Sequence, residues 1–151
     1  MSAIRRILTV AAAGVLATTG FIGLSGSPAH AASDCRTPYT QNGWNVTVCT
    51  NQEYTYSNRI DATSAVYRHP SNCGTYRVYV VDYLGGKRLL RSTSARSCGT
   101  LAATTDWAYW SEFTKDSNND VAWGFARLVA WDTSGHQILS IDAPRVALRA
   151  F

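Results

Sequence analysis

Residues 122–131 carry the sequence AWGFARLVAW, which alternates strictly between two kinds of side chain and decides the fold class. The odd-numbered positions hold large side chains and one arginine: Trp123, Phe125, Arg127, Val129 and Trp131. The even-numbered positions hold small or aliphatic residues: Ala122, Gly124, Ala126, Leu128 and Ala130. A period of two is that of a β-strand, whereas a helix would spread the aromatic residues around its circumference. The segment is therefore expected to be a long strand whose small-residue face is closely covered.

The segments that follow predict two further strands. Residues 132–135, DTSG, are typical of a hairpin turn with glycine at the position that favours a positive φ angle. Residues 137–142 are expected to return as the partner strand, and Pro144 interrupts it. Beyond the proline, apolar residues alternate with arginine and alanine, which predicts a terminal strand that runs to Phe151.

The segments before residue 122 repeat the pattern. Residues 75–83, TYRVYVVDY, meet Gly85 and Gly86, and residues 87–94 then return, which makes this the clearest hairpin in the chain. Further β-prone segments occupy residues 44–49, 53–57 and 65–68. Residues 106–115, DWAYWSEFTK, fit either a short helix capped by Asp106 or a strand, and the alternation of Trp107, Tyr109 and Ser111 favours the strand. About eight short strands with turns between them predict an all-β fold, an antiparallel β-sandwich or a barrel.

The first 31 residues are predicted to be an export signal. Arg5 and Arg6 form a basic start, residues 7–24 are largely apolar, and Ala29-His30-Ala31 is a cleavage site of the A-x-A kind. A transmembrane anchor is the alternative, and the glycines and threonines within the apolar run count against it. We expect cleavage after Ala31, an irregular N-terminal arm over residues 32–43, and a single β-sandwich domain over residues 44–151. The mature protein is expected to be extracellular and to have no contact with a membrane.

The charge of the mature chain excludes one class of function. Its 120 residues hold 12 basic and 10 acidic side chains, because two of the 14 basic residues lie in the signal. A net charge of +2 does not indicate a nucleic-acid binder that works by neutralising phosphates.

Four cysteines follow the signal: Cys35, Cys49, Cys73 and Cys98. An even number of cysteines in an exported chain predicts two disulfides, and the sequence allows three connectivities. We favour Cys35 with Cys49 and Cys73 with Cys98, because sequential pairs close short loops across adjacent strands. A zinc site is the alternative, but no two cysteines have the C-x2-4-C spacing.

The sequence contains no recognisable set of catalytic residues. His69 with Glu53 or Glu112 is the acid–base pair that composition alone would offer, and nothing in their spacing supports it. Residues 116–120, DSNND, begin like a calcium loop, but Val121 and Arg127 replace the glycine and glutamate that the loop requires. We therefore expect no enzyme, no metal site and no cofactor, and a solvated loop at residues 116–120. A low-affinity calcium site formed by Asp116, Asp120 and a backbone carbonyl is the alternative for this loop.

Tyrosine, tryptophan and arginine are unusually frequent in the mature chain, and these residue types supply buried anchors at protein interfaces. A sandwich of this length is too small to bury all its aromatic residues, so an exposed patch is expected. The candidate partner-binding residues are Arg36, Tyr39, Trp107, Tyr109 and Trp110. For Tyr39, the alternative is that the arm is the first edge strand and that its ring packs in the core.

In its size, its signal, its two expected disulfides and the strand pattern of residues 32–151, the chain resembles small β proteins that filamentous soil bacteria export. It is most similar to the adaptor subunits of umbrella toxin particles. That resemblance implies a non-enzymatic adaptor, with lectin-like subunits and a large toxin subunit as partners, and a role in competition between bacteria. It contains no diagnostic motif, so it assigns no binding residue. An inhibitor of an extracellular hydrolase and a carbohydrate-binding module are the alternative functions.

Overall fold

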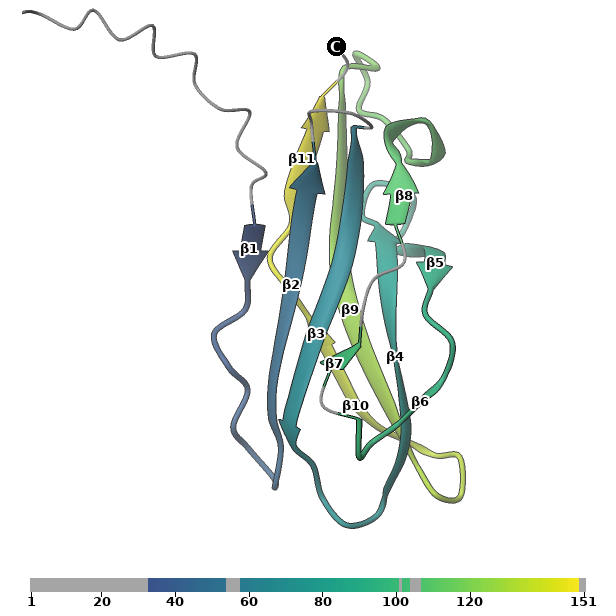
Figure 1. Ribbon diagram of the computed structural model, residues 1–151. Helices are drawn as coiled ribbons and strands as arrows, with labels where there is room; N and C mark the ends of the chain where they lie inside the picture. Colours follow the sequence, from purple (N-terminus) through teal and green to yellow (C-terminus); the bar gives the residue numbers. More distant parts are fainter. Residues whose placement is uncertain (1–32, 54–57, 101, 104–106, 150–151) are drawn as a thin grey trace, which may run out of the picture.

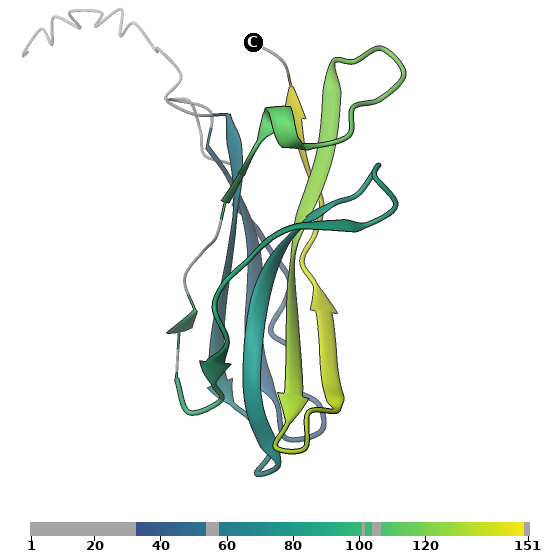
Figure 2. The ribbon, with the colours of Figure 1, turned by 90° about the vertical axis from the view of Figure 1, so that its right-hand side faces the viewer.

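The computed structural model describes residues 33–53, 58–100, 102–103 and 107–149. They form two antiparallel sheets that pack face to face (Figure 1, and edge-on in Figure 2). The β2–β3 sheet contains β1 (Ser33–Cys35), β2 (Asn45–Glu53), β3 (Arg59–Arg68), β7 (Ala102–Ala103) and β8 (Trp107–Tyr109). The β4–β9 sheet contains β4 (Cys73–Asp82), β5 (Arg88–Ser92), β6 (Arg96–Ser97), β9 (Val121–Asp132), β10 (Gln137–Asp142) and β11 (Val146–Arg149). The expected all-β fold, an antiparallel β-sandwich, is confirmed.

The strand that decides the fold class, β9, lies inside its sheet between β4 on one side and β10 and β11 on the other. Its small-residue face points into the sandwich, and every even-numbered residue from 122 to 130 is buried. Gly124 shows how closely this face is covered, because a Cβ atom there would lie 2.5 Å from Phe113 and 2.6 Å from Ile60. The expectation of a closely covered face is confirmed.

Within the described residues, three edge positions of the sandwich are each shared by two short strands. β7 and β8 both pair with β3, β5 and β6 with β4, and β10 and β11 with β9. The third division falls at Pro144, whose nitrogen has no hydrogen to donate to the ladder. The described residues contain eleven strands, whereas the sequence predicts about eight; the short strands β1, β6 and β7 are the ones it does not predict. Short edge strands also present little backbone for pairing with another chain.

A buried threonine fills the division between β10 and β11. Thr50 points inward from β2, and its side-chain oxygen accepts a hydrogen bond from the Ala126 N–H at 2.9 Å. The same hydroxyl donates to the Pro144 carbonyl at 2.9 Å. One residue further along the inward face of β2, Gln52 donates to the Ala147 carbonyl. Side chains of one sheet thus hydrogen-bond to backbone groups of the other at the division and in the strand that follows it.

A buried carboxylate ties the β4–β5 hairpin to the connection between β8 and β9. Asp82 accepts hydrogen bonds from the Gly85 N–H at 3.1 Å and from the Thr114 N–H and hydroxyl at 3.0 and 2.7 Å. The Arg88 guanidinium lies 3.3 Å from the same carboxylate. Burial opposes ionisation, but these hydrogen bonds outweigh it and lower the pKa of Asp82. In Figure 2, the hairpin and the connection extend to the same side of the sandwich.

Three segments differ from their sequence-based expectation. β3 begins at Arg59, whereas only residues 65–68 were expected at this strand, because its polar outward positions hide the alternation from Ile60 onward. The arm expected to be irregular contains β1, which pairs with β2, and Tyr39 forms an isolated bridge with Val46. The segment 106–115 contains both β8 and a 3-10 turn at Trp110–Glu112, so the expectation of a strand holds only for its first part.

The predicted signal, residues 1–31, lies outside the described residues, as do positions 54–57, 104–106 and 150–151.

Both predicted disulfides are confirmed. Cys35 and Cys49 stand directly opposite each other on β1 and β2. The second bond joins Cys73 at the start of β4 to Cys98, which follows β6. No cysteine is left as a free thiol. Two disulfides are compatible with an extracellular location, where the redox conditions preserve them.

Candidate binding surface

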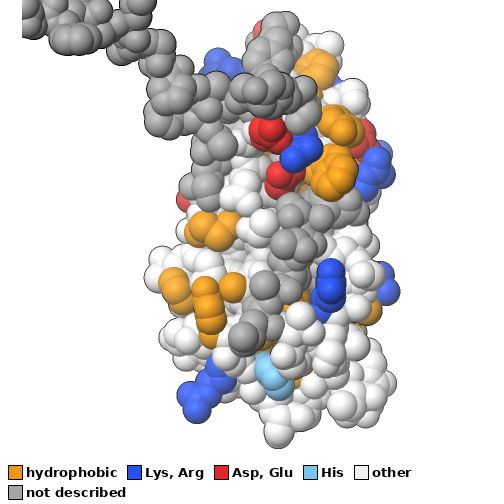
Figure 3. All heavy atoms as spheres, viewed as in Figure 1, with side chains coloured by type: hydrophobic (Ala, Val, Ile, Leu, Met, Phe, Trp, Pro, Cys, Tyr) orange, Lys and Arg blue, Asp and Glu red, His pale blue; other side chains and the backbone are white. Residues whose placement is uncertain are grey.

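Two exposed aromatic side chains lie side by side along β8. Trp107 and Tyr109 are 42% and 43% exposed, while Ala108 between them is buried, as the alternation of a strand requires. β8 pairs with the first residues of β3, which places Trp107 opposite Asp61 and Tyr109 opposite Arg59. Figure 3 shows hydrophobic side chains next to acidic and basic ones over the upper part of this face.

Arg59 organises the charged part of this surface. Its guanidinium lies 5.0 Å from the centre of the Trp107 ring and makes ion pairs with Glu53 at 2.8 Å and Asp61 at 2.9 Å. Burial raises the pKa of Asp61, and the neighbouring Arg59 offsets only part of this effect. We call these five residues the β8 surface: Glu53, Arg59, Asp61, Trp107 and Tyr109. Two carboxyl groups surround one guanidinium, so the surface is acidic and complements a basic group.

Trp110, the third aromatic residue expected in this patch, does not join it. Its ring is half-buried against the core, and the Lys115 ammonium lies 4.3 Å from the ring centre. The alternation of β8 places position 110 on the same face as the buried Ala108, opposite to the exposed pair. The 3-10 turn begins at Trp110, and the Glu112 carboxylate in it accepts the Tyr109 N–H at 3.1 Å.

Arg36 and Tyr39, the other candidates, lie at the opposite edge of the β2–β3 sheet. Tyr39 is half-buried and exchanges backbone hydrogen bonds of 2.9 and 3.1 Å with Val46, which favours the edge-strand alternative. Arg36 is exposed, and its guanidinium donates to the Asp142 carbonyl at 3.4 Å. Residues 36–41 line a hollow of about 430 Å³. The candidate residues therefore form two separate groups, one at each edge of the sheet.

Sequence reasoning missed Arg59 and Asp61, and it named Glu53 only as half of an acid–base pair. The Arg-x-Asp spacing of residues 59 and 61 places both side chains on one face of a strand. That signal has meaning only if the strand begins at residue 59, which the polar composition of the segment concealed.

The remaining polar candidates lie apart from one another. His69 follows the last residue of β3, whereas Glu53 pairs with the first, so the length of this strand separates them. Glu112 makes an ion pair of 2.6 Å with Arg91. Asp116 accepts the N–H groups of Asp120 and Val121, which makes residues 116–120 an ordered turn. Among the described residues, no group of three or more His, Cys, Asp or Glu side chains is placed to hold a metal ion.

The described part of the chain contains no helix that is long and apolar enough to cross a bilayer. Comparison with known proteins found no matching family model, no matching curated protein and no matching solved structure. Fold and surface together define the class: a two-disulfide antiparallel β-sandwich with an aromatic surface at one sheet edge.

Proposed function

We propose that the protein is a secreted, non-enzymatic module that binds another protein through the β8 surface. The observation that carries this proposal is the exposed pair of Trp107 and Tyr109 beside the Arg59 guanidinium. Tryptophan, tyrosine and arginine are the residues that dominate binding energy at protein interfaces. Trp107 is already held by Arg59, so little side-chain entropy is lost when a partner covers it.

The chemistry of the surface also indicates the kind of partner. The two carboxyl groups of Glu53 and Asp61 surround Arg59, which favours a partner with a basic side chain near an apolar contact. A surface that combines carboxylates with aromatic rings selects its partner more narrowly than aromatic rings alone. It therefore supports protein recognition over the alternative of a carbohydrate-binding module, in which open ring faces stack on sugars.

A bridging role is the more specific form of the proposal. An adaptor between lectin-like subunits and a large toxin subunit needs two contact surfaces that are occupied at the same time. The chain offers the β8 surface at one edge of the β2–β3 sheet and the hollow lined by residues 36–41 at the other. A hydrolase inhibitor needs only one surface, so the number of partners distinguishes the two functions.

Capture from the native culture fluid tests the proposal. The immobilised protein should retain a protein partner, and the Trp107→Ala/Tyr109→Ala variant should reduce its capture by at least about tenfold, because truncation of one anchor typically costs about 2 kcal/mol. Tyr67→Ala is the matched control, since Tyr67 is a 61% exposed tyrosine near the other end of β3. Equal capture by the double variant would contradict the proposal. Retention on polysaccharide without a protein partner would favour the carbohydrate-binding alternative. Capture of a single hydrolase would favour the inhibitor.

A further inference from the structure

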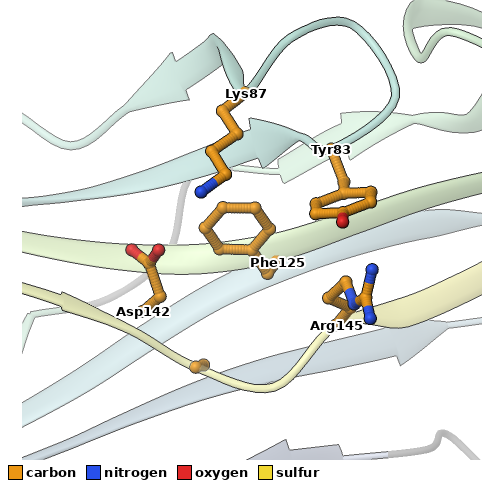
Figure 4. Close-up of a pocket in the computed structure, with 6 residues that line it drawn as sticks. Tyr83, Lys87, Phe125, Asp142 and Arg145 are labelled. Carbon is orange, nitrogen blue, oxygen red and sulfur yellow. The ribbon is translucent and has the colours of Figure 1, made fainter.

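A second candidate site lies on the outer face of the β4–β9 sheet, away from the β8 surface. It is a pocket of about 170 Å³ at the junction of the β4–β5 hairpin, β9 and the β10–β11 connection. Figure 4 shows Phe125 at its centre, with Lys87 and Asp142 on one side and Tyr83 and Arg145 on the other. Ala143 completes the lining.

The base of the pocket is aromatic and fixed in place. Phe125 is only 3% exposed although it lies on the outer face of β9. The Tyr83 ring meets it edge to face, with ring centres 6.5 Å apart and an interplanar angle of 66°. The Arg145 guanidinium covers Tyr83 at 4.3 Å from the ring centre. The Arg127 guanidinium lies 5.4 Å from the centre of the Phe125 ring, so a flat ring that enters the pocket meets a small, preorganised aromatic surface bordered by two guanidinium groups.

Positive charges outnumber negative ones around the aromatic floor of the pocket. Both oxygens of the Asp142 carboxylate are occupied by Arg127, at 2.5 and 2.8 Å, so this acidic group is already neutralised. Lys87 and Arg145 add two further positive charges, and neither makes an ion pair within the described part of the chain. In Figure 4, the Lys87 ammonium points toward the space beside Phe125. The pocket thus carries an excess of positive charge next to an apolar floor.

Size limits what can bind. An apolar cavity of about 150 Å³ is known to hold one benzene molecule, whereas drug-sized ligands occupy about 300–1,000 Å³. The volume here therefore matches one ring and a small substituent. The Arg145 guanidinium lies 4.3 Å from the centre of the Tyr83 ring, and a guanidinium can form two parallel hydrogen bonds with a planar carboxylate.

We infer that this pocket binds a single planar ring that carries a carboxylate. The ring packs on Phe125 and Tyr83, Arg145 pairs with the carboxylate, and Lys87, on the other side of Phe125, adds to the positive charge that attracts it. Two sources have this chemistry: a free aromatic acid, and the C-terminal aromatic residue of a protein. The inference does not depend on the β8 surface, since the two sites lie on different sheets.

Titration with 3-phenylpropionate, followed by NMR of the labelled protein, tests the inference. The expected result is a saturable shift of the Tyr83 and Phe125 signals. The neutral amide of 3-phenylpropionate should bind at least about fivefold more weakly than the acid, as expected for the loss of one partly exposed ion pair. A peptide that ends in phenylalanine, with a free or an amidated C-terminus, distinguishes the two sources. Binding of the free peptide indicates a protein terminus, and binding of the small acid alone indicates a metabolite.

Variants locate the site. Arg145→Gln and Lys87→Asn should each weaken binding of 3-phenylpropionate about fivefold. Asparagine is chosen because residue 87 has a φ of +61°, which asparagine tolerates. Arg68→Gln, at an exposed arginine of the other sheet, is the matched control, and Trp107→Ala should leave this binding unchanged. Equal affinity for the acid and its amide, or an Arg145→Gln variant that binds like Arg68→Gln, would overturn the inference.

Discussion

Replacing Thr50 by valine should destabilise the sandwich far more than the loss of one oxygen atom suggests. The hydroxyl accepts from the Ala126 N–H and donates to the Pro144 carbonyl, both at 2.9 Å. Valine has nearly the same shape, so it keeps the packing and removes both hydrogen bonds. The Ala126 N–H is then left unpaired in the interior, and the carbonyl of the half-buried Pro144 loses its partner.

The magnitude follows from these two groups. A buried donor or acceptor without a partner costs about 1–3 kcal/mol, so the pair costs about 2–6 kcal/mol. The added methyl group of valine returns about 0.8 kcal/mol. The difference leaves a range of about 1–5 kcal/mol, and we expect the free energy of unfolding to fall by about 2–4 kcal/mol, near the middle of it. Thr50→Ser keeps the hydroxyl and loses only a methyl group, which should cost about 1 kcal/mol.

Urea unfolding with the disulfides intact, followed by tryptophan fluorescence, measures this difference. Thr47→Val is the matched control, because Thr47 is half-buried on the outward face of the same strand, and it should change stability by less than about 0.5 kcal/mol. A Thr50→Val protein as stable as Thr50→Ser would refute the reasoning. The Thr50 hydroxyl would then not be the partner on which the Ala126 N–H and the Pro144 carbonyl depend.

Three further predictions concern the core, a buried carboxylate and the first disulfide. Gly124→Ala should cost about 1–3 kcal/mol in urea unfolding, because its Cβ would lie 2.5 Å from a ring carbon, whereas Gly99→Ala should be nearly neutral. Asp82 has a lowered pKa in the folded state, so it contributes stability above about pH 4 that is lost as the pH falls through its folded value. Asp82→Asn should therefore be less stable than the wild type at pH 7, and the difference should shrink on acidification in a pH series. Removing the bond between Cys35 and Cys49, whose separation is 14 residues, should cost about 3 kcal/mol from loop entropy. Hydrogen exchange should then show β1 losing protection before β9, and simultaneous loss would contradict this order.

The parts of the fold that were predictable are those with a strong local pattern. The ten residues from 122 to 131 alternate between small and large side chains, and Gly135 adopts a φ of +86° in the turn that follows. Both disulfides join segments that are close in sequence, so the connectivity also followed from spacing. Local chemistry was sufficient for these features.

The candidate site was only half predictable, because it depends on pairing between distant segments. Trp107 and Tyr109 were recognisable as an alternating aromatic pair, but their charged neighbours come from β2 and β3, 46 or more residues earlier. Trp110 was expected beside them, although the same alternation puts an even-numbered position on the face of the buried Ala108. The pocket around Phe125 needs three connections of one sheet to meet, which no local pattern encodes.

Oxidative footprinting of the complex recovered from culture fluid tests most directly whether the β8 surface binds a partner. Hydroxyl radicals modify exposed aromatic side chains, and Trp107, Tyr109 and Tyr67 are all exposed in the free protein. Protection of Trp107 and Tyr109 in the complex, with Tyr67 modified as before, is the predicted result. Unchanged modification of Trp107 and Tyr109 in a complex that is fully formed would contradict the proposal that the β8 surface is the contact.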